Sequence, residues 1–451
     1  MSLTANSLGS SIFRGRFGLK YAYVAGGMYR GVASVDLVVR MARAGFIGFF
    51  GTGGLSLGTI DAALRSLRSR LSDGEPFGMN LLANHVDAAL ERRTVDLFLA
   101  HGVRCIEAAA FTQITPALVV YRARGLSRRA DGGPVCEHRL IAKVSRPEVA
   151  DAFMRPAPDG MIHELHASGA ITAEQADLAT RVPVSDVVCV EADSGGHTDG
   201  GVASVLLPAI TRLRDRISAQ HAYPEPICVG LAGGLGTPDA VAAAFVLGAD
   251  FVLTGSINQC TVESGAHPAV KALLQQMNVQ DTDYAPAGDM FEIGAKVQVL
   301  KKSVFFPARA NRLHAWYSHY EGLHALPDRI RDSIENTWFR KSLDAVWEET
   351  REYLTQRGLS DDLARAQRDP KHRMALVFRW YFHYSTAEAM HGGADRVNYQ
   401  IHTGPALGAF NQWVKHTPLE AWENRHADEI GLKLMNDAAW FLQDRFLALS
   451  G

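Results

Sequence analysis

One histidine, His197, stands in a glycine-rich stretch that directly follows an apolar segment. Residues 186–193 read DVVCVEAD, which is typical of a buried strand, and residues 194–201 read SGGHTDGG. A histidine at such a position can exchange a proton near neutral pH, because its reference pKa is about 6.5. The alternative is a structural histidine that bonds a neighbouring loop. Glu191 and Asp193 share one face at strand spacing, and we expect them to orient this loop rather than to form an acid pair.

Three glycine-bearing segments suggest a second kind of chemistry, the binding of a nucleotide-like cofactor whose phosphate lies at the last two of them. They read AGGMYRG, AGGLGTPDA and TGS at residues 25–31, 232–240 and 254–256. Glycine lets the backbone approach a ligand closely, and the N–H groups of a helix N-terminus bind anions. Thr237 and Pro238 suit the start of a helix directly after the second segment. A tight turn is the alternative for any single glycine pair, but two such segments after neighbouring strands favour a phosphate site.

Short apolar runs alternate with helical patterns throughout the first 260 residues. Helical patterns such as VASVDLVVRMARAG (32–45) and TPDAVAAAFVLGAD (237–250) fall between the runs. Near-continuous apolar strands that alternate with helices indicate a parallel sheet covered by helices, and eight units favour a closed (β/α)8 TIM barrel over an open sheet. A longer helical excursion is expected at 156–183. The eight apolar runs are 21–27, 46–54, 77–83, 104–111, 140–145, 186–193, 226–234 and 251–256.

The pattern changes after residue 260. The segment from 261 to about 400 is rich in Trp, Tyr, Arg and Glu and shows helical periodicity without clear strand alternation. We expect an inserted helical substrate or carrier-protein subdomain at 263–401, and a barrel domain that comprises 1–262 and 402–451.

Composition narrows the class of protein. The 451 residues are 47% hydrophobic and 21% charged, and 46 Lys and Arg against 48 Asp and Glu give a net charge of −2. The protein therefore has no strong overall electrostatic field that would favour nucleic acid or a membrane surface as its partner. The five cysteines stand far apart, which argues against a zinc site and a disulfide framework. With no signal peptide and no apolar stretch of about 18 residues, we expect a soluble cytoplasmic protein.

Several long segments resemble a known family. The segments 230–259 (GLAGGLGTPDAVAAAFVLGADFVLTGSINQ), 194–197 (SGGH) and 263–274 (ESGAHPAVKALL) resemble the flavin-dependent nitronate monooxygenase superfamily, which includes FMN-type enoyl-acyl-carrier-protein reductases. Three further segments are similar to the PfaD-like, trans-acting enoyl reductases of polyketide and polyunsaturated fatty-acid synthases. They are IGAKVQVLKKSVFFPARANRL (293–313), RDPKHRMALVFRWY (368–381) and YQIHTGPALGAFNQWVK (399–415).

The resemblance implies FMN as cofactor and NADPH as the source of hydride. It places Asn80 at the polar edge of the flavin ring and Lys143 beside its N1–C2=O side, where a cation tunes the cofactor. One departure is that Gly255-Ser256-Ile257 stands where the superfamily often has Gly-Thr-Arg, so the phosphate would depend on N–H donors. The cofactor-binding residues implied are Ala25, Gly26, Gly27, Met28, Asn80, Lys143, Gly196, Gly233, Gly234, Gly255 and Ser256.

The resemblance also gives His197 a role. In an enoyl reductase, His197 would donate a hydrogen bond to the thioester oxygen or a proton to the α-carbon of the substrate. The expected substrate is an enoyl thioester on the phosphopantetheine arm of an acyl carrier protein. Lys301, Lys302, Arg309 and Arg312 form a basic run that is either solvated or meets this partner.

Two other functions stay open at this point. A nitronate monooxygenase would need neither NADPH nor a carrier protein, and a barrel without chemistry would serve as a binding component of a synthase. The sequence leaves open whether the chain forms a homodimer.

Overall fold

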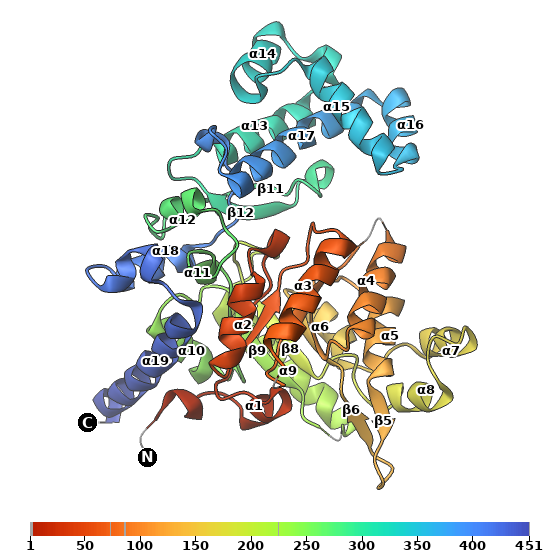
Figure 1. Ribbon diagram of the computed structural model, residues 1–451, viewed down its shortest axis with the longest axis vertical. Helices are drawn as coiled ribbons and strands as arrows, with labels where there is room; N and C mark the ends of the chain where they lie inside the picture. The colour runs from red at the N-terminus through yellow and green to blue at the C-terminus, as the bar shows by residue number, and fades with distance from the viewer. Residues whose placement is uncertain (1–2, 73, 85–86, 224, 451) are drawn as a thin grey trace. The chain divides into compact units, whose positions relative to one another are not determined.

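The computed structural model describes residues 3–72, 74–84, 87–223 and 225–450, which fall into two compact units (Figure 1). The first unit comprises Met1–Ser194, Thr198–Gly265 and Ala409–Gly451. The second comprises Gly195–His197 and Ala266–Gly408.

Eight parallel strands close into a barrel in the first unit. Their order around the barrel is β1-β10-β9-β8-β7-β4-β3-β2, and each predicted apolar run overlaps one of them. The (β/α)8 barrel predicted from the sequence is therefore confirmed. The strands are β1 (Tyr23–Ala25), β2 (Ile47–Phe50), β3 (Gly78–Leu82), β4 (Cys105–Ala109), β7 (Arg139–Val144), β8 (Val187–Glu191), β9 (Cys228–Ala232) and β10 (Val252–Thr254).

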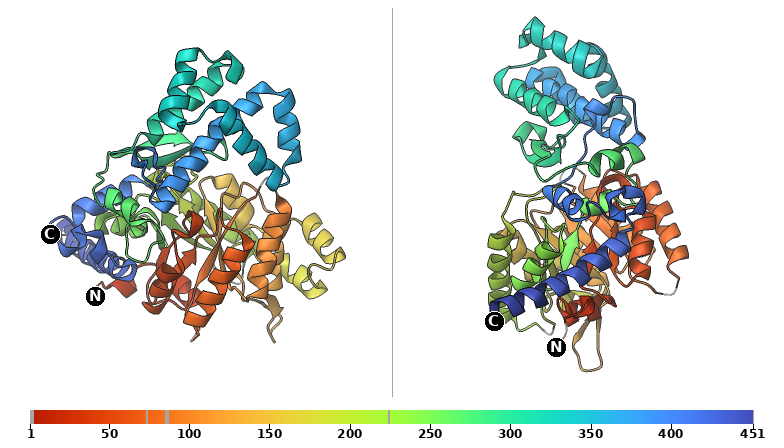
Figure 2. Two further views of the ribbon diagram at one scale, coloured as in Figure 1. Left: turned by 45° about the horizontal axis from the view of Figure 1, so that its top comes forward. Right: turned by 90° about the vertical axis from the view of Figure 1, so that its left-hand side faces the viewer.

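Helices surround the barrel, and α10 begins at Pro238 directly after Thr237, as predicted, although the Thr237 side chain makes no capping hydrogen bond. Ser34, Ser56 and Thr115 each accept a hydrogen bond from a backbone N–H of the first turn that follows. The C-terminal helix α19 (Ala427–Ser450) packs against α10 and α2 (Figure 2). The other helices of this unit are α1 (Ser11–Phe17), α2 (Val35–Arg43), α3 (Leu57–Arg70), α4 (Ala88–Ala100), α5 (Pro116–Arg124), α6 (Pro147–Met154), α7 (Asp159–Ala167), α8 (Ala173–Ala179), α9 (Ala203–His221), α10 (Pro238–Val246) and α11 (Ser256–Gln259).

Apolar side chains fill the barrel interior, starting at the amino-terminal ends of the strands. Phe13 and Phe17 of α1 pack in one cluster with inward-facing residues of the strands, and the ring of Phe13 stacks on that of Phe251 at 4.1 Å. The interior is therefore a packed core and not a pore.

A small hairpin, β5 (Leu126–Arg128) with β6 (Pro134–Cys136), was not predicted.

Asp186, a buried carboxylate directly before β8, lies close to three arginine side chains. Its Oδ2 lies 2.6 Å from Nη1 of Arg139 and 3.6 Å from that of Arg16, and its Oδ1 lies 3.3 Å from Nη1 of Arg122. Burial alone would raise the pKa of Asp186, but the three guanidinium groups lower it to about 2. This ion cluster ties α1 and α5 to the strands.

We expect Asp186→Asn to lower the free energy of unfolding by about 3 kcal/mol at pH 7, because it leaves buried arginines without their counter-ion. The folded-state pKa lies below the ordinary value of 3.8, so the carboxylate stabilises the fold above about pH 4 and loses this effect as the pH falls toward 2. The difference between variant and parent in urea unfolding should therefore shrink over that range. The exposed Asp215→Asn is the control, and an equal loss in both variants would contradict the assignment.

The second unit combines helices with a β-hairpin. Its core contains Phe291, Phe306, Tyr381 and Phe382, so the aromatic segment 378–384 packs mainly as helical core. The antiparallel pair β11 (Thr282–Pro286) and β12 (Lys296–Leu300) was not predicted, because each strand is short and lies among helical patterns. The helices are α12 (Pro268–Leu274), α13 (Phe306–His319), α14 (Asp328–Asp332), α15 (Leu343–Gln356), α16 (Ser360–Arg368) and α17 (Pro370–His391), and α18 (Pro405–Trp413) crosses from this unit to the first.

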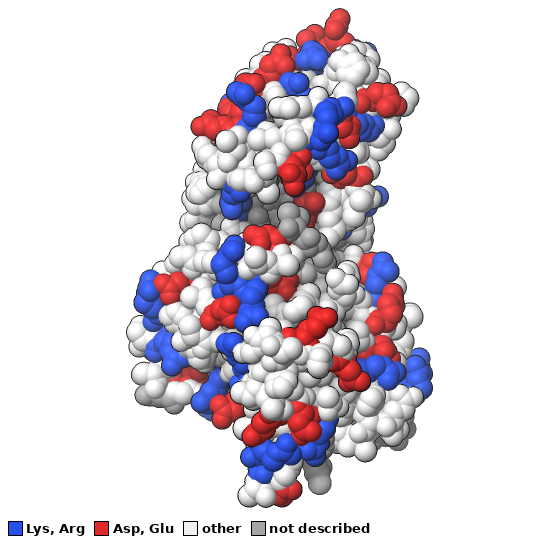
Figure 3. Space-filling view, turned by 90° about the vertical axis from the view of Figure 1, so that its right-hand side faces the viewer, with Lys and Arg blue, Asp and Glu red and all other residues white. Residues whose placement is uncertain are grey.

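The surface carries mixed charge. Basic and acidic side chains are interspersed over the face in Figure 3, in keeping with the net charge of −2. Among the residues that the structure describes, no helix is both long and apolar enough to cross a bilayer.

Candidate active site

Four polar side chains form a layer inside the barrel, above the apolar core. Asn80 lies on β3, Glu107 on β4, Lys143 on β7 and Glu191 on β8. Because successive side chains of a strand alternate between faces, Glu107 shares the inward face of the core residue Cys105, and the same holds for Lys143 with Ile141 and Glu191 with Cys189. The barrel therefore changes from apolar to charged toward the carboxyl ends of its strands.

Glu107 connects the members of this layer. Its Oε2 accepts hydrogen bonds from the backbone N–H of Gly27 at 2.7 Å and from Nδ2 of Asn80 at 3.3 Å. Its Oε1 lies 3.5 Å from Nζ of Lys143, which in turn lies 2.8 Å from Oε1 of Glu191. The Glu107 carboxylate thus contacts the loop that follows β1 (the β1 loop), Asn80 on β3 and the ammonium group of Lys143.

The charges in this layer shift the pKa values of its groups. Burial alone would lower the pKa of Lys143, but Glu191 and Glu107 raise it above its ordinary value. Burial raises the pKa of Glu107, while Lys143 and the N–H of Gly27 oppose this shift. Lys143 therefore stays protonated at neutral pH, inside the barrel near the carboxyl end of β7.

The first glycine pair allows the β1 loop to lie directly on this layer. A Cβ built at Gly27 would come 2.6 Å from Cβ of Asn80 and 2.8 Å from Oε2 of Glu107. A Cβ at Gly26 would come 2.6 Å from Cδ2 of Leu253. A side chain at Gly27 would therefore displace the polar layer, and one at Gly26 would require Leu253 to move. Ala25, the last residue of β1, is buried, and Met28, which follows the glycines, is half-buried.

The second and third glycine segments follow the neighbouring strands β9 and β10. Gly233 and Gly234 have φ angles of 91° and 76°, in the left-handed region that favours glycine. A Cβ at Gly233 would come 2.7 Å from the carbonyl oxygen of Ala192, whereas a Cβ at Gly234 or Gly255 would have no described atom within 4 Å. Ser256 begins α11. The two loops therefore leave open space beside Gly234 and Gly255.

His197 and Gly196 belong to the second unit. Nε2 of His197 lies 3.2 Å from Oδ1 of Asp289, and 39% of the His197 side chain is exposed. The preceding Gly195 lies against the backbone of Thr403, because a Cβ there would come 2.9 Å from three of its atoms. Residues that come much later in the chain thus contact the loop Gly195–His197, which we call the GGH loop.

Sequence reasoning did not identify Glu107, Asp289 or His402. Glu107 gave a local signal, since it is a single carboxylate within the apolar run 104–111 and must be paired if that run is a buried strand. Asp289 and His402 gave no signal in the sequence, because only the fold of the second unit brings these two residues close to His197.

The basic run of the second unit is partly engaged within that unit. Nζ of Lys302 donates to the carbonyl oxygen of Gln276 at 2.7 Å, and the guanidinium of Arg309 bonds Asn398 and lies over the rings of Phe305 and Trp338. Lys301 and Arg312 are exposed. The four residues therefore do not act as one free cationic cluster.

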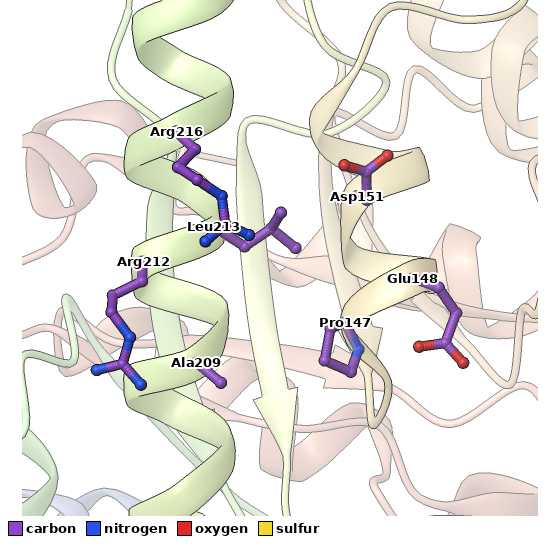
Figure 4. A pocket seen from close by; sticks show the side chains of 7 residues that line it. All are labelled: Pro147, Glu148, Asp151, Ala209, Arg212, Leu213 and Arg216. Carbon is purple, nitrogen blue, oxygen red and sulfur yellow. The ribbon is translucent and has the colours of Figure 1, made fainter.

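A separate hollow of about 610 Å³ lies on the first unit between α6 and α9 (Figure 4). None of the residues predicted from the sequence lines it. Its lining residues are Pro147, Glu148, Asp151, Ala209, Arg212, Leu213 and Arg216.

Two family models match the chain. That of nitronate monooxygenase matches residues 11–302, and that of the inserted helical domain of acyl-carrier-protein S-malonyltransferase matches residues 320–399. The first match covers most of the barrel, and the second covers helices of the second unit.

Individual relatives extend the similarity over nearly the whole chain. The polyketide biosynthesis protein ThaF of Burkholderia thailandensis is 55% identical over 445 residues, 98% of this chain and 38% of ThaF. The polyketide biosynthesis protein PksE of Bacillus subtilis is 52% identical over 448 residues, 99% of this chain and 58% of PksE. The chain thus spans less than two thirds of either relative.

A solved structure matches both units. The enoyl reductase domain of MlnA, from the macrolactin biosynthesis cluster of Bacillus amyloliquefaciens, is 41% identical, with a TM-score of 0.95 and coverage of 98% of this chain and 99% of that one. The chain therefore belongs to the nitronate monooxygenase family, in the branch that contains the enoyl reductases of polyketide synthases.

Proposed function

We propose that the protein is an FMN-dependent enoyl reductase that acts in trans on thioesters of an acyl carrier protein during polyketide or polyunsaturated fatty-acid assembly. NADPH is the proposed source of hydride. The observation that carries this proposal is the match with the enoyl reductase domain of MlnA, which extends over the second unit as well as the barrel.

The residues at the carboxyl ends of the strands fit an FMN group. Lys143 offers a buried positive charge and Asn80 an amide, which suit the polar part of a flavin ring. The open space beside Gly234 and Gly255 suits a phosphate bound by backbone N–H groups. The cofactor is proposed to be held by Ala25, Gly26, Gly27, Met28, Asn80, Lys143, Gly233, Gly234, Gly255 and Ser256, with Gly196 contributing from the GGH loop.

When bound, FMN would supply the hydride that the β-carbon of an enoyl thioester accepts. In this proposal Lys143 favours negative charge in the bound group, and Glu107 keeps Lys143 and the β1 loop in place. Addition of hydride to the β-carbon puts negative charge on the thioester oxygen and leaves the α-carbon in need of a proton. His197 is proposed to donate to one of these two atoms.

An acyl carrier protein is the proposed partner of the second unit. The family model that matches residues 320–399 is named for a domain of an enzyme that acts on acyl carrier protein, which supports this choice. Exposed Lys301 and Arg312 are candidates for contact with its acidic surface.

Anaerobic mixing tests the proposed reaction. The oxidised protein should lose its yellow colour with NADPH and regain it with a crotonyl thioester on an acyl carrier protein, with formation of the saturated thioester. Rapid turnover of an alkyl nitronate with oxygen, without reaction of the enoyl thioester, would instead favour the monooxygenase. Flavin that reacts with none of these compounds would favour a non-catalytic component.

A further inference from the structure

The GGH loop lies against an extended segment beside the β11–β12 hairpin. His402 forms an isolated antiparallel bridge with Val299 of β12, the N–H of Leu300 donates to the carbonyl oxygen of Ile401 at 2.9 Å, and Gly195 lies against Thr403. Backbone hydrogen bonds thus join residues 401–403 to the hairpin and give the loop a fixed support. These contacts within the second unit support the loop that carries His197.

Asp289 lies on the turn of the same hairpin, and buried neighbours fix this turn. The N–H of Ala287 donates to the carbonyl oxygen of Ala295 at 2.7 Å, which closes the base of the turn. Gly288 lies on the ring of Phe382, and Phe291 is buried against that ring at a centroid distance of 5.5 Å. Although 63% of the Asp289 side chain is exposed, its backbone is held on both sides.

The direction of the hydrogen bond between the two side chains follows from their chemistry. An ionised carboxylate only accepts hydrogen bonds, so Nε2 of His197 must donate to Oδ1 of Asp289 across the 3.2 Å that separates them. A carboxylate in this position orients the ring and stabilises its protonated form. Partial desolvation would raise the pKa of Asp289, but the hydrogen bond and the charge of His197 lower it, which is consistent with this pairing.

Two other titratable side chains, His402 and Arg379, interact with the pair. Burial is the main cause that lowers the pKa of His402 to about 4, and His197 adds to the shift, so His402 is neutral at neutral pH. Its Nε2 lies 2.8 Å from Nε2 of Gln400. Arg379 of α17 also acts on Asp289 and lowers its pKa. Asp289 is thus the carboxylate that the structure places at hydrogen-bond distance from the His197 ring.

We propose that Asp289 is a positioning residue for His197, which orients the imidazole and stabilises its protonated form for donation to the substrate. This inference rests on the proposed enoyl reductase function, in which His197 is the donor. Asp289 itself need not touch the substrate or the cofactor.

Asp289→Asn tests the pairing without reference to activity. It keeps the size of the side chain and removes its charge, so the pH midpoint of the His197 ring signals in NMR should fall by roughly one unit. His197→Ala identifies those signals by their loss. Asp283→Asn, an exposed aspartate on β11 of the same hairpin, should leave the midpoint unchanged. An unchanged midpoint in Asp289→Asn would overturn the proposal, whatever the enzyme catalyses.

Kinetics tests the consequence for the reaction. In Asp289→Asn, reduction of the enoyl thioester by the NADPH-reduced protein should slow about tenfold at neutral pH, and the limb of its pH profile that depends on a protonated donor should move to lower pH. Flavin content and the rate of reduction by NADPH should match the parent, and Asp289→Glu should restore part of the rate.

The two proposals fail in different ways. Loss of rate in His197→Ala with parental rate and pH profile in Asp289→Asn would refute the positioning role and leave the enoyl reductase function in place. A parent protein that does not reduce enoyl thioesters would refute that function, and the NMR midpoint would still decide whether Asp289 controls the protonation of His197.

Discussion

Replacing Gly234 with aspartate should lower the affinity for FMN by at least about 100-fold, because like charges brought together cost several kcal/mol. The residue has a φ of 76° and open space where a side chain would begin. If the phosphate of FMN lies in this space, a carboxylate would repel it. Mass spectrometry of the released cofactor and fluorescence titration of the apoprotein with FMN measure the effect.

Gly234→Asn is the matched control for this variant. Asparagine has the size of aspartate and tolerates the left-handed region about equally well, so it separates charge from shape and backbone strain. It should retain FMN with an affinity much closer to that of the parent. Equal loss in both variants would point to crowding or strain, and equal retention would place the phosphate elsewhere. Release of FAD from the parent would refute the choice of cofactor.

The barrel could be predicted because its strands are buried on both faces. Each strand reads as a short apolar run, such as DVVCVEAD, and glycine marks several of their carboxyl ends. The loops that carry Gly27 and Gly234 were located for the same reason, since a strand end fixes where a βα loop begins. The sequence therefore predicted where these loops begin, and their role in holding a cofactor stays a prediction.

The pairings within the site depend on information that the local pattern lacks. Lys143 was expected as a single cation, but its position depends on Glu107 and Glu191, which lie on two other strands. The β11–β12 hairpin was missed although KVQVL alternates, because five residues among helical patterns are a weak signal. Without this hairpin, nothing connects Asp289 or His402 with His197.

His197→Ala should slow reduction of the enoyl thioester by roughly 10²–10³, the usual cost of losing one donor to a developing oxyanion or one general acid. Two features limit the expected loss to this step. The GGH loop is held by the second unit, and the groups that fit FMN best, Lys143 and Asn80, belong to the barrel. Flavin content and the rate of flavin reduction by NADPH should therefore stay near the parental values. Stopped-flow absorbance of the flavin measures the two half-reactions separately.

The exposed His163→Ala on α7 is the control for His197→Ala and should match the parent in both half-reactions. The pattern of loss decides the role of His197, because donation to the substrate affects only the second half-reaction. A variant that cannot hold flavin would make His197 a cofactor or structural residue. Parental rates in both half-reactions would show that the GGH loop is only a turn. A loss near 10³ that added imidazole partly restores, and restores most at pH values where imidazole is protonated, would support a role of His197 as proton donor, since imidazolium can supply the missing proton.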